Sequence, residues 1–381
     1  MTDVLHVDHS MVLGGAERSV LELARAQNAL GDRARVAVGR EGPFAAALRS
    51  SSIPVVPLGW RRRYVDAPSD ARLARMVGGA AATIDASLKL RRVVHDASPD
   101  VVQAHTRKAQ LVASLGLVGA GTPLVWHLRD DVPRRPALRR LLRAAIGRAD
   151  HAVAISTWLA GHYAELRLLP RSGRIDVVPS SVDPAPLSAL PTPWLDGDRA
   201  PVLGFVGQIA DWKAPDVIVD LAEQLADRPD VRFVIVGDVW FTNADRGYGD
   251  RLAARVREST AAPRIERLGT RAPAEAFAAL DILVHTSREP EPFGRVVVEA
   301  MMARRPVVGF RRGAVPEILG DGTGALADGF DAAALARAVR SVIDDPAGSR
   351  AMAERAAASA RRYAPDRIAA TMADVYARTL G

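Results

Sequence analysis

The chain has 381 residues, 48% of them hydrophobic, and a formal net charge of +7. This length predicts two domains of ordinary size, and the absence of cysteine excludes disulfides, thiolate metal ligands and a cysteine nucleophile. Aromatic residues make up 5%, without zinc-finger spacing or an RNP-type motif, so nucleic acid is not an expected partner. Polar residues interrupt the N-terminal apolar segment and no run of 18 apolar residues occurs, so we expect no signal peptide, no spanning helix and a cytoplasmic protein.

Strand-like apolar segments alternate with helix-like amphipathic segments along the chain. The predicted strands are Val4–Val7, Arg35–Val38, Ile53–Pro57, Asp100–Gln103, Pro123–His127, His151–Ile155, Ile175–Val178, Val202–Val206, Val231–Val236, Arg264–Leu268, Ile282–Val284 and Pro306–Gly309. Continuous apolar strands separated by amphipathic helices are typical of parallel sheets with both faces covered. The expected fold class is therefore α/β, with two doubly wound, Rossmann-like parallel-sheet domains facing a cleft and C-terminal helices packing back toward the first domain.

A proline-rich segment, 179–201, separates the two halves and predicts the domain limits. We expect a first domain at 1–180, a linker at 181–201, a second domain at 202–362 and a returning C-terminal helix at 363–381. The linker contains Asp196-Gly-Asp198, a metal–nucleotide motif in another class of transferase, but its place outside a strand end favours a solvated turn. No His or carboxylate cluster has metal-ligand spacing and no P-loop occurs, so we expect no metal site.

In the first domain, small and polar residues follow the predicted strands. Gly14-Gly15 comes before the first helix, where glycines allow close approach of a phosphate or sugar to the backbone; a tight turn with positive φ is the alternative. The three spaced glycines of a dinucleotide site are missing, so an NAD oxidoreductase is a distant hypothesis.

Two histidines follow neighbouring predicted strands of this domain. His105 and His127 are expected at carboxyl strand ends facing the cleft, and His127 lies in a polar cluster with Arg129 and Asp130. We therefore favour His127 as a functional residue, whereas for His105 a structural role is an equal alternative.

The segment 281–303, DILVHTSREPEPFGRVVVEAMMA, is the most informative one. The apolar strand Ile282–Val284 runs into a polar loop with Glu291, and Phe293–Gly294 then opens a helix that carries Glu299. A helix start after a buried strand presents unpaired N–H groups and a positive dipole end to a phosphate. We expect Glu299 to hold ribose hydroxyls and Glu291 to reach beyond the phosphates.

This helix also allows a plainer interpretation. Arg295 and Glu299 are four positions apart and suit an ordinary salt bridge on a solvated helix face. The segment alone does not decide between the two.

Lysine is rare in this chain, because only Lys89, Lys108 and Lys213 accompany 48 arginines. Lys213 follows Gly207-Gln208 and precedes a predicted helix at 216–226, where a flexible ammonium beside a helix N-terminus suits a diphosphate. The later strand ends at Gly237 and Leu268 place glycine where a nucleoside can lie against the backbone.

Two further segments suggest contacts with other partners. Residues 136–149 form a basic amphipathic pattern that suits either peripheral docking on an anionic membrane or ordinary packing. The loop Trp60–Tyr64, with three arginines after the tryptophan, suits a glycan or lipid phosphate, or is simply exposed.

These segments together resemble the retaining nucleotide-sugar glycosyltransferases of family 4, which have the GT-B fold, and the similarity extends over nearly the whole chain. It rests mainly on Glu291-x7-Glu299 with Pro292-Phe293-Gly294. The Gly207…Lys213 segment, Val177–Asp183 and Gly14-Gly15-Ala-Glu17 support it.

The resemblance implies a metal-independent retaining transfer of a sugar from a nucleoside-diphosphate sugar, with UDP or GDP expected, to a glycan, lipid-linked or small-molecule acceptor. The first domain would bind the acceptor and the second the donor, in the cytoplasm or at the inner face of the membrane. The implied catalytic residues are His127, Lys213 and Glu291. The implied donor-binding residues are Gly14, Gly15, Gln208, Lys213, Gly237, Leu268, Glu291, Phe293, Gly294 and Glu299, and the acceptor-side candidates are His105, Arg129 and Asp130.

The chain departs from the family pattern at three places. Gln208 stands where the family usually has arginine, Ala214 replaces a glycine, and serine at 180–181 stands where a glycine is usual. Two alternatives therefore stay open: a GT-B-type nucleotide-sugar 2-epimerase, and a catalytically inactive sugar-nucleotide-binding or assembly protein.

Overall fold

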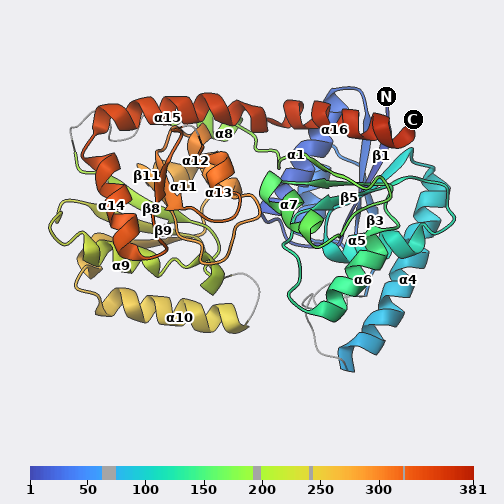
Figure 1. Ribbon diagram of the computed structural model, residues 1–381, viewed down its shortest axis with the longest axis horizontal. Helices are drawn as coiled ribbons and strands as arrows, with labels where there is room; N and C mark the ends of the chain where they lie inside the picture. The colour runs from blue at the N-terminus through green and yellow to red at the C-terminus, as the bar shows by residue number, and fades with distance from the viewer. Residues whose placement is uncertain (62–73, 192–198, 240–242, 321) are drawn as a thin grey trace. The chain divides into compact units, whose positions relative to one another are not determined.

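The computed structural model describes residues 1–61, 74–191, 199–239, 243–320 and 322–381. The chain divides into two compact units, Met1–Val182 with Tyr363–Gly381 and Asp183–Arg362 (Figure 1). Two sequence predictions, the part of the tryptophan loop at 62–64 and the Asp196-Gly-Asp198 turn, lie outside the described residues.

The first unit contains a seven-stranded parallel sheet in the order β3-β2-β1-β4-β5-β6-β7. Its strands are β1 (Asp3–Asp8), β2 (Arg33–Val38), β3 (Val55–Pro57), β4 (Val101–Ala104), β5 (Leu124–Leu128), β6 (His151–Ala154) and β7 (Ile175–Val177). Its helices are α1 (Gly15–Ala29), α2 (Pro43–Ser50), α4 (Ala74–Ala97), α5 (Arg107–Gly116), α6 (Pro136–Ile146), α7 (Thr157–Glu165) and α16 (Pro365–Leu380). The strand order reverses between β1 and β4, where doubly wound sheets bind ligands.

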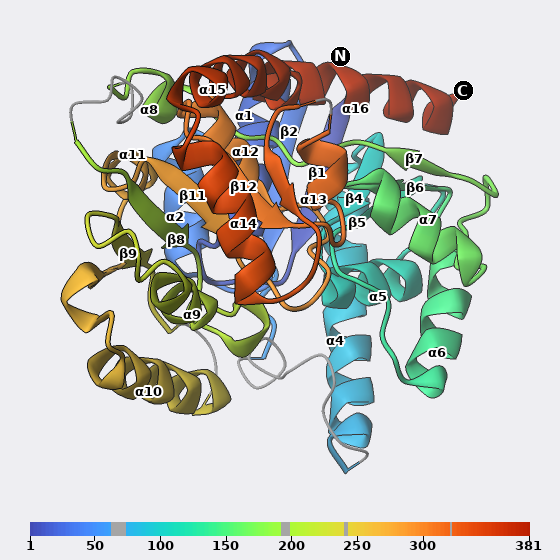
Figure 2. The same cartoon turned by 60° about the vertical axis from the view of Figure 1, so that its left-hand side comes forward.

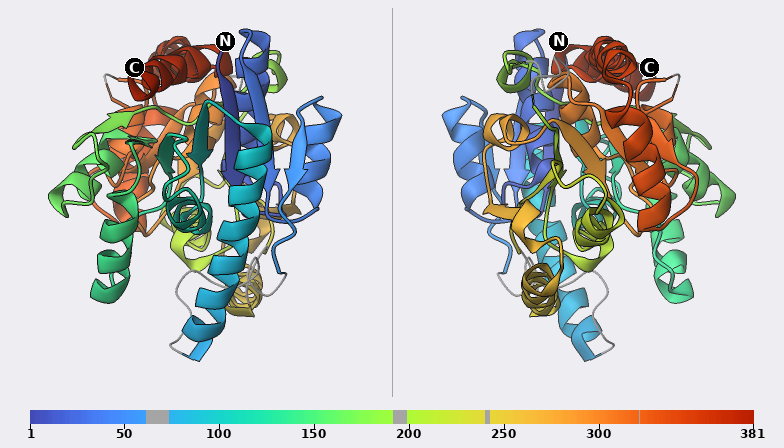
Figure 3. Two further views of the ribbon diagram at one scale, coloured as in Figure 1. Left: turned by 90° about the vertical axis from the view of Figure 1, so that its right-hand side faces the viewer. Right: turned by 90° about the vertical axis from the view of Figure 1, so that its left-hand side faces the viewer.

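The C-terminal helix α16 is part of the core of this first unit. It lies beside α1 (Figure 1) and buries apolar side chains, Met372 and Val375 among them, against strand residues such as Val4 and Val125. On another part of the unit α4 and α5 lie side by side (Figure 3). The prediction that the C-terminal helix packs back on the first domain is confirmed.

The second unit contains a six-stranded parallel sheet in the order β10-β9-β8-β11-β12-β13. Its strands are β8 (Val202–Val206), β9 (Arg232–Val236), β10 (Ile265–Gly269), β11 (Ile282–His285), β12 (Val307–Phe310) and β13 (Ala325–Ala327). Its α-helices are α8 (Ala185–Ser188), α9 (Val217–Gln224), α10 (Asn243–Glu258), α11 (Pro273–Ala278), α12 (Arg295–Met302), α13 (Val315–Ile318), α14 (Ala332–Ile343) and α15 (Pro346–Ala360). Helix α14 packs against β12, β13 and α9 (Figure 2). The switch point of this sheet lies between β8 and β11.

The predicted fold class, two Rossmann-like parallel sheets, is confirmed, and two local predictions need correction. Trp60 is fully buried rather than presented to a ligand. Its ring packs against Gly39, and its backbone N–H donates to the Gly39 carbonyl at 2.8 Å. Strand β13 was not predicted, since Ala325–Ala327 is too short to show a periodic pattern.

Candidate functional site

Lys213 and Glu291 meet at the switch point of the second sheet. Lys213 follows β8 and Glu291 follows β11, and these two strands are paired neighbours. Their carboxyl ends therefore lie at the same edge, although the two residues are far apart in sequence. The structure thus brings together the two side chains that carry opposite charge in the predicted donor site.

The two side chains form a largely buried ion pair. Lys213 Nζ lies 2.5 Å from Glu291 Oε2, with 15% and 11% of the side chains exposed. Ser287 donates to the same oxygen at 3.2 Å, and His285 Nε2 lies 3.6 Å from it. Burial alone raises the pKa of Glu291, but the charge of Lys213 and a hydrogen bond from His285 hold that pKa below its ordinary value. Glu291 is therefore ionised at neutral pH.

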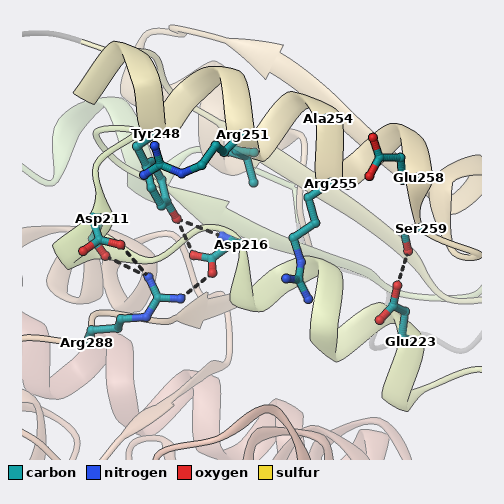
Figure 4. A pocket seen from close by; sticks show the side chains of 11 residues that line it. Asp211, Asp216, Glu223, Tyr248, Arg251, Ala254, Arg255, Glu258, Ser259 and Arg288 are labelled. Atoms are coloured by element: carbon teal, nitrogen blue, oxygen red, sulfur yellow. Dashed lines mark hydrogen bonds and ion pairs between the residues drawn. The ribbon is translucent and has the colours of Figure 1, made fainter. Parts of the chain in front are cut away.

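The loop that holds Lys213 is fixed to the loop after β11 by several hydrogen bonds. Thr286 Oγ1 donates to the Lys213 carbonyl at 2.8 Å, and the Arg288 N–H donates to the Trp212 carbonyl at 2.9 Å. The Arg288 guanidinium binds Asp211 and Asp216 (Figure 4). These contacts within the protein hold the Lys213 loop and the Glu291 loop at a fixed separation.

A pocket of about 580 Å³ lies beside the ion pairs of Arg288, between α9 and α10 (Figure 4). Tyr248 and Arg251 of α10 line it, together with Arg288 and the carboxylates of Asp211 and Asp216. Tyr248 donates to Asp216, and Arg288 is bound by two carboxylates, so much of this charge is already paired. Neither Lys213 nor Glu291 is among its lining residues, and we do not assign the donor to it.

Lys213 precedes a helix, as the sequence predicts, but a short 3₁₀ turn holds the lysine itself. Lys213 ends this turn, Asp211–Lys213, and α9 begins only at Val217. Ala214 between them has φ +51° and ψ +51°, a left-handed conformation that glycine adopts with less strain. A glycine here, which the family resemblance implies, would adopt this backbone with less strain. The Lys213 ammonium also lies 4.3 Å from the centre of the Trp212 ring.

Helix α12 begins directly after the Glu291 loop, at Arg295, with Gly294 as its N-cap. Phe293 is buried beneath this start. Arg295 Nε lies 2.8 Å from Glu299 Oε1, and both side chains are about 15% exposed. The salt bridge considered as the alternative therefore forms, on a helix whose N-terminal end adjoins Glu291.

Glycines line the ends of the strands next to β8. Gly237 follows β9 with φ +136°, and a Cβ there would lie 1.7 Å from the Gly207 carbonyl oxygen. The Gly237 N–H donates to the Gly269 carbonyl at 2.9 Å. The backbones after β8, β9 and β10 are thus packed closely, and Gln208 and Leu268 lie beside these glycines.

In the first unit, Gly14 and Gly15 open α1 without positive φ, so the tight turn considered as the alternative does not form. The Gly14 N–H donates to Glu17 Oε2 at 3.0 Å. Arg129, just after β5, reaches the same helix start and donates to the Ala16 carbonyl at 3.0 Å. The neighbouring Asp130 side chain is more than half exposed.

His105 and His127 are buried within the first unit, with 0% and 1% of their surface exposed and ring centres 5.1 Å apart. Burial is the main cause that lowers the pKa of each imidazole well below 6.5, and the charge of Arg129 lowers it further. A hydrogen bond with the Val178 backbone raises the pKa of His127, but less than burial lowers it. Both rings are therefore neutral at physiological pH.

Four site residues escaped the sequence reasoning: His285, Thr286, Ser287 and Arg288. Their only sequence signal was their position just after a buried strand, the rule that identified Lys213.

Among the described residues, no group of three or more His, Asp or Glu side chains is arranged to hold a metal ion. None of the described helices combines the length and apolar character that a bilayer span requires. Helix α6 buries Leu142 and Ile146, while Leu141 is 51% exposed.

Two family models match the chain. The model of glycosyltransferase family 4 matches residues 13–186, and the model of group 1 glycosyl transferases matches residues 193–361. The chain therefore belongs to the family 4 (group 1) glycosyltransferases, and its fold is GT-B.

Among solved structures, HepE of Anabaena in complex with UDP has a TM-score of 0.81 at 26% identity and covers 99% of this chain and 100% of its own. HepE in complex with UDP-glucose also has a TM-score of 0.81, at 25% identity, with the same coverage. Sucrose-phosphate synthase of Thermosynechococcus elongatus, with a TM-score of 0.79 at 16% identity, shares the fold.

Among curated relatives, the D-inositol 3-phosphate glycosyltransferase of Streptomyces avermitilis is 36% identical over 179 residues, 45% of this chain and 38% of that protein. The 2-deoxystreptamine glucosyltransferase of Streptomyces kanamyceticus is 35% identical over 223 residues, 55% of this chain and 54% of that protein. The match thus spans about two fifths to one half of the length of these relatives.

Proposed function

We propose that this protein is a metal-independent, retaining glycosyltransferase that moves a sugar from a nucleoside-diphosphate sugar to a carbohydrate, lipid-linked or small-molecule acceptor. The observation that carries this proposal is the buried pair of Lys213 and Glu291 at the start of α12. A cation beside a helix N-terminus suits a diphosphate, and an ionised carboxylate suits sugar hydroxyls. Because HepE was solved with UDP and with UDP-glucose, we favour UDP over GDP as the nucleotide.

In this proposal each donor group has its own residues. Lys213 neutralises the diphosphate, Glu291 accepts hydrogen bonds from the sugar, and Glu299 binds the ribose. Gly237 and Leu268 lie against the nucleoside. The remaining contacts are assigned to Gln208 and to the backbone of Phe293 and Gly294.

The difficult chemical step is departure of the nucleoside diphosphate from an oxocarbenium-like sugar. In this proposal Lys213 stabilises the negative charge that develops on the leaving oxygen, an effect commonly worth a factor of about 10²–10³ for one donor group. The leaving phosphate then accepts the proton of the attacking hydroxyl on the same face of the sugar, which retains the configuration. Glu291 orients the sugar and is not assigned as a nucleophile.

The donor is tested first by thermal shift with UDP-, GDP- and dTDP-sugars in the presence of EDTA. At about 100 times its Kd, a true donor is expected to add ~2.7 kcal/mol to the free energy of unfolding. If none of these sugars raises the melting temperature, the assignment of a nucleotide-sugar site is wrong.

The catalytic role is tested with Lys213→Ala, and Lys89→Ala is the matched control. Lys89 also makes an ion pair, with Asp85 at 3.0 Å, but on α4. Lys213→Ala is expected to lower kcat/KM for sugar transfer by about 10²–10³, whereas Lys89→Ala keeps it. A Lys213 variant with full turnover contradicts the mechanism. Turnover of the donor that does not depend on an acceptor would instead indicate an epimerase.

We propose a small ring polyol as the first acceptor class to test. D-inositol 3-phosphate and 2-deoxystreptamine, the compounds in the names of two relatives, are both hydroxylated six-membered carbon rings, but one is anionic and the other cationic. Product formation with each, followed by mass spectrometry, distinguishes the charge that the acceptor site tolerates. No product with either would direct the search to glycan or lipid-linked acceptors.

A further inference from the structure

A chain of buried polar side chains connects the C-terminal helix to His127. Tyr376 of α16 donates to Gln103 Oε1, and Gln103 Nε2 lies 3.1 Å from His127 Nδ1. In the other direction, Gln27 Nε2 lies 3.1 Å from the Tyr376 hydroxyl, and Gln27 Oε1 lies 2.7 Å from His6 Nε2. Each of these residues is essentially fully buried, so each group depends on its partners within this network.

Arg129 decides the direction of the hydrogen bonds. Its Nη2 lies 3.5 Å from His127 Nδ1, and a guanidinium only donates. His127 Nδ1 therefore accepts, and Gln103 must present its NH₂ group to the ring. The Gln103 oxygen then faces Tyr376, which donates to it. Without Arg129, both amides in the network could be reversed together with equal satisfaction.

The positions of the remaining protons in the network follow from this assignment. Since Tyr376 donates to Gln103, it accepts from the Gln27 NH₂ group, and the Gln27 oxygen accepts from His6 Nε2–H. His6 Nδ1 is then an acceptor at 2.8 Å from His105 Nε2, which must carry a proton. Burial lowers the pKa of His6 to about 4, in keeping with a neutral ring. Every polar contact of the network thus has one donor and one acceptor.

We propose that Tyr376 is a positioning residue that, through Gln103, holds His127 as the neutral tautomer with its proton on Nε2. The imidazole then carries a hydrogen-bond donor, not a base, at Nε2. The consequence for catalysis rests on the proposed function, for which the family resemblance implies His127 as a catalytic residue. In that role the ring would donate a hydrogen bond and would not remove a proton from the acceptor.

The tautomer is measured by ¹H–¹⁵N NMR of the imidazoles in the full chain, with His127→Gln used to assign the signals. We expect wild-type His127 to show a protonated Nε2 and an unprotonated Nδ1 from pH 6 to 8. Gln103→Glu places a carboxylate oxygen where the NH₂ group was, so it is expected to move the proton to Nδ1. Tyr376→Phe frees the Gln103 amide to turn, which leaves only the 3.5 Å contact of Arg129 to keep the proton off Nδ1, and is expected to give a mixed pattern.

Val375→Ala is the matched control, because Val375 is buried on the same helix and its side chain belongs to the apolar core of this unit. It should lower the melting temperature yet leave the His127 spectrum and kcat unchanged. Tyr376→Phe should lower kcat about tenfold, the cost of one transition-state hydrogen bond, with KM for the donor unchanged.

The outcomes separate this inference from the proposed function. A wild-type His127 with its proton on Nδ1, or a Tyr376→Phe variant with an unaltered imidazole spectrum, would overturn the inference whatever the activity. If no nucleotide sugar is turned over but the expected tautomers are observed, the proposed function fails and the positioning role of Tyr376 stands.

Discussion

Asp8 ends β1 at the switch point of the first sheet and is fully buried. Its Oδ1 accepts from the Ser10 N–H at 2.8 Å, while Oδ2 has no hydrogen-bond partner among the described residues. Burial, and then the charge of Glu17, raise the pKa of Asp8 from 3.8 to about 8. A carboxyl group in this position is therefore protonated in the folded protein at neutral pH and ionised in the unfolded chain.

The raised pKa predicts how stability depends on pH. The native state holds the Asp8 proton more tightly than the unfolded state, so its contribution is complete below about pH 4 and is lost as pH rises toward 8. Asp8→Asn keeps the oxygen that accepts from Ser10 and never ionises. Relative to the wild type, its melting temperature should therefore rise as pH increases, by about 5 °C or more between pH 5 and pH 9.

The control for this prediction is Asp96→Asn, which changes a carboxylate with 79% of its side chain exposed. Its difference from the wild type should not grow between pH 5 and pH 9. A constant difference for Asp8→Asn over the same range would show that Asp8 titrates normally.

At the scale of elements, the loop after β12 holds the Glu291 loop in place. Gly313 has φ +62°, and a Cβ there would lie 2.4 Å from the Glu291 carbonyl oxygen and 2.5 Å from its nitrogen. The next N–H, of Ala314, donates to that carbonyl at 2.9 Å. Glu291, and with it the start of α12, can occupy this position only because residue 313 is a glycine and has no side chain.

Gly313→Ala is expected to displace Glu291 and to weaken binding of a nucleotide sugar at least tenfold. Gly322→Ala is a matched control within the same unit, since Gly322 has φ +72° but its nearest neighbour is the Arg355 side chain at 3.6 Å. Both variants should lose ~1–2 kcal/mol of stability from backbone strain, measured by thermal unfolding. Equal donor affinity in the two variants, measured by calorimetry, would contradict the role of Gly313.

The elements also show how far the sequence alone could lead. Long apolar strands and the Glu291-x7-Glu299 spacing are local patterns, so the fold class and this loop–helix segment were predictable. The partner that Glu291 takes, Lys213, depends on which strands become neighbours. Local patterns do not contain that information, which is why His285, Ser287 and the Tyr376 network were missed.

Burial of single residues was equally hard to predict. Trp60 precedes a run of arginines, which suggests an exposed loop, yet its ring fills space beside Gly39. The deciding contact comes from a residue 21 positions away that has no side chain to mark it. Tertiary packing overrides local composition at such positions.

At the scale of the whole molecule, the last residues of the chain complete the first unit. Helix α16 adds four large apolar or aromatic side chains to its core, Ile368, Met372, Val375 and Tyr376, each at most 3% exposed. The core cluster of the second unit contains no residue after Ala353. The stability of each unit therefore depends on a different part of the C-terminal sequence.

Removal of residues 363–381 is therefore expected to unfold or loosen the first unit and to spare the second. Burying one large apolar side chain contributes ~1.5–3 kcal/mol, so four of them contribute about as much as the ~5–15 kcal/mol that holds a whole domain folded. Hydrogen exchange should show lost protection in β1, β4 and β5, while β8 and β11 stay protected and gain protection when UDP is added. Val375→Ala, which removes one such side chain, should give a partial version of the same pattern. Equal loss of protection in both sheets would contradict this division, because it would mean that α16 supports the second unit as strongly as the first.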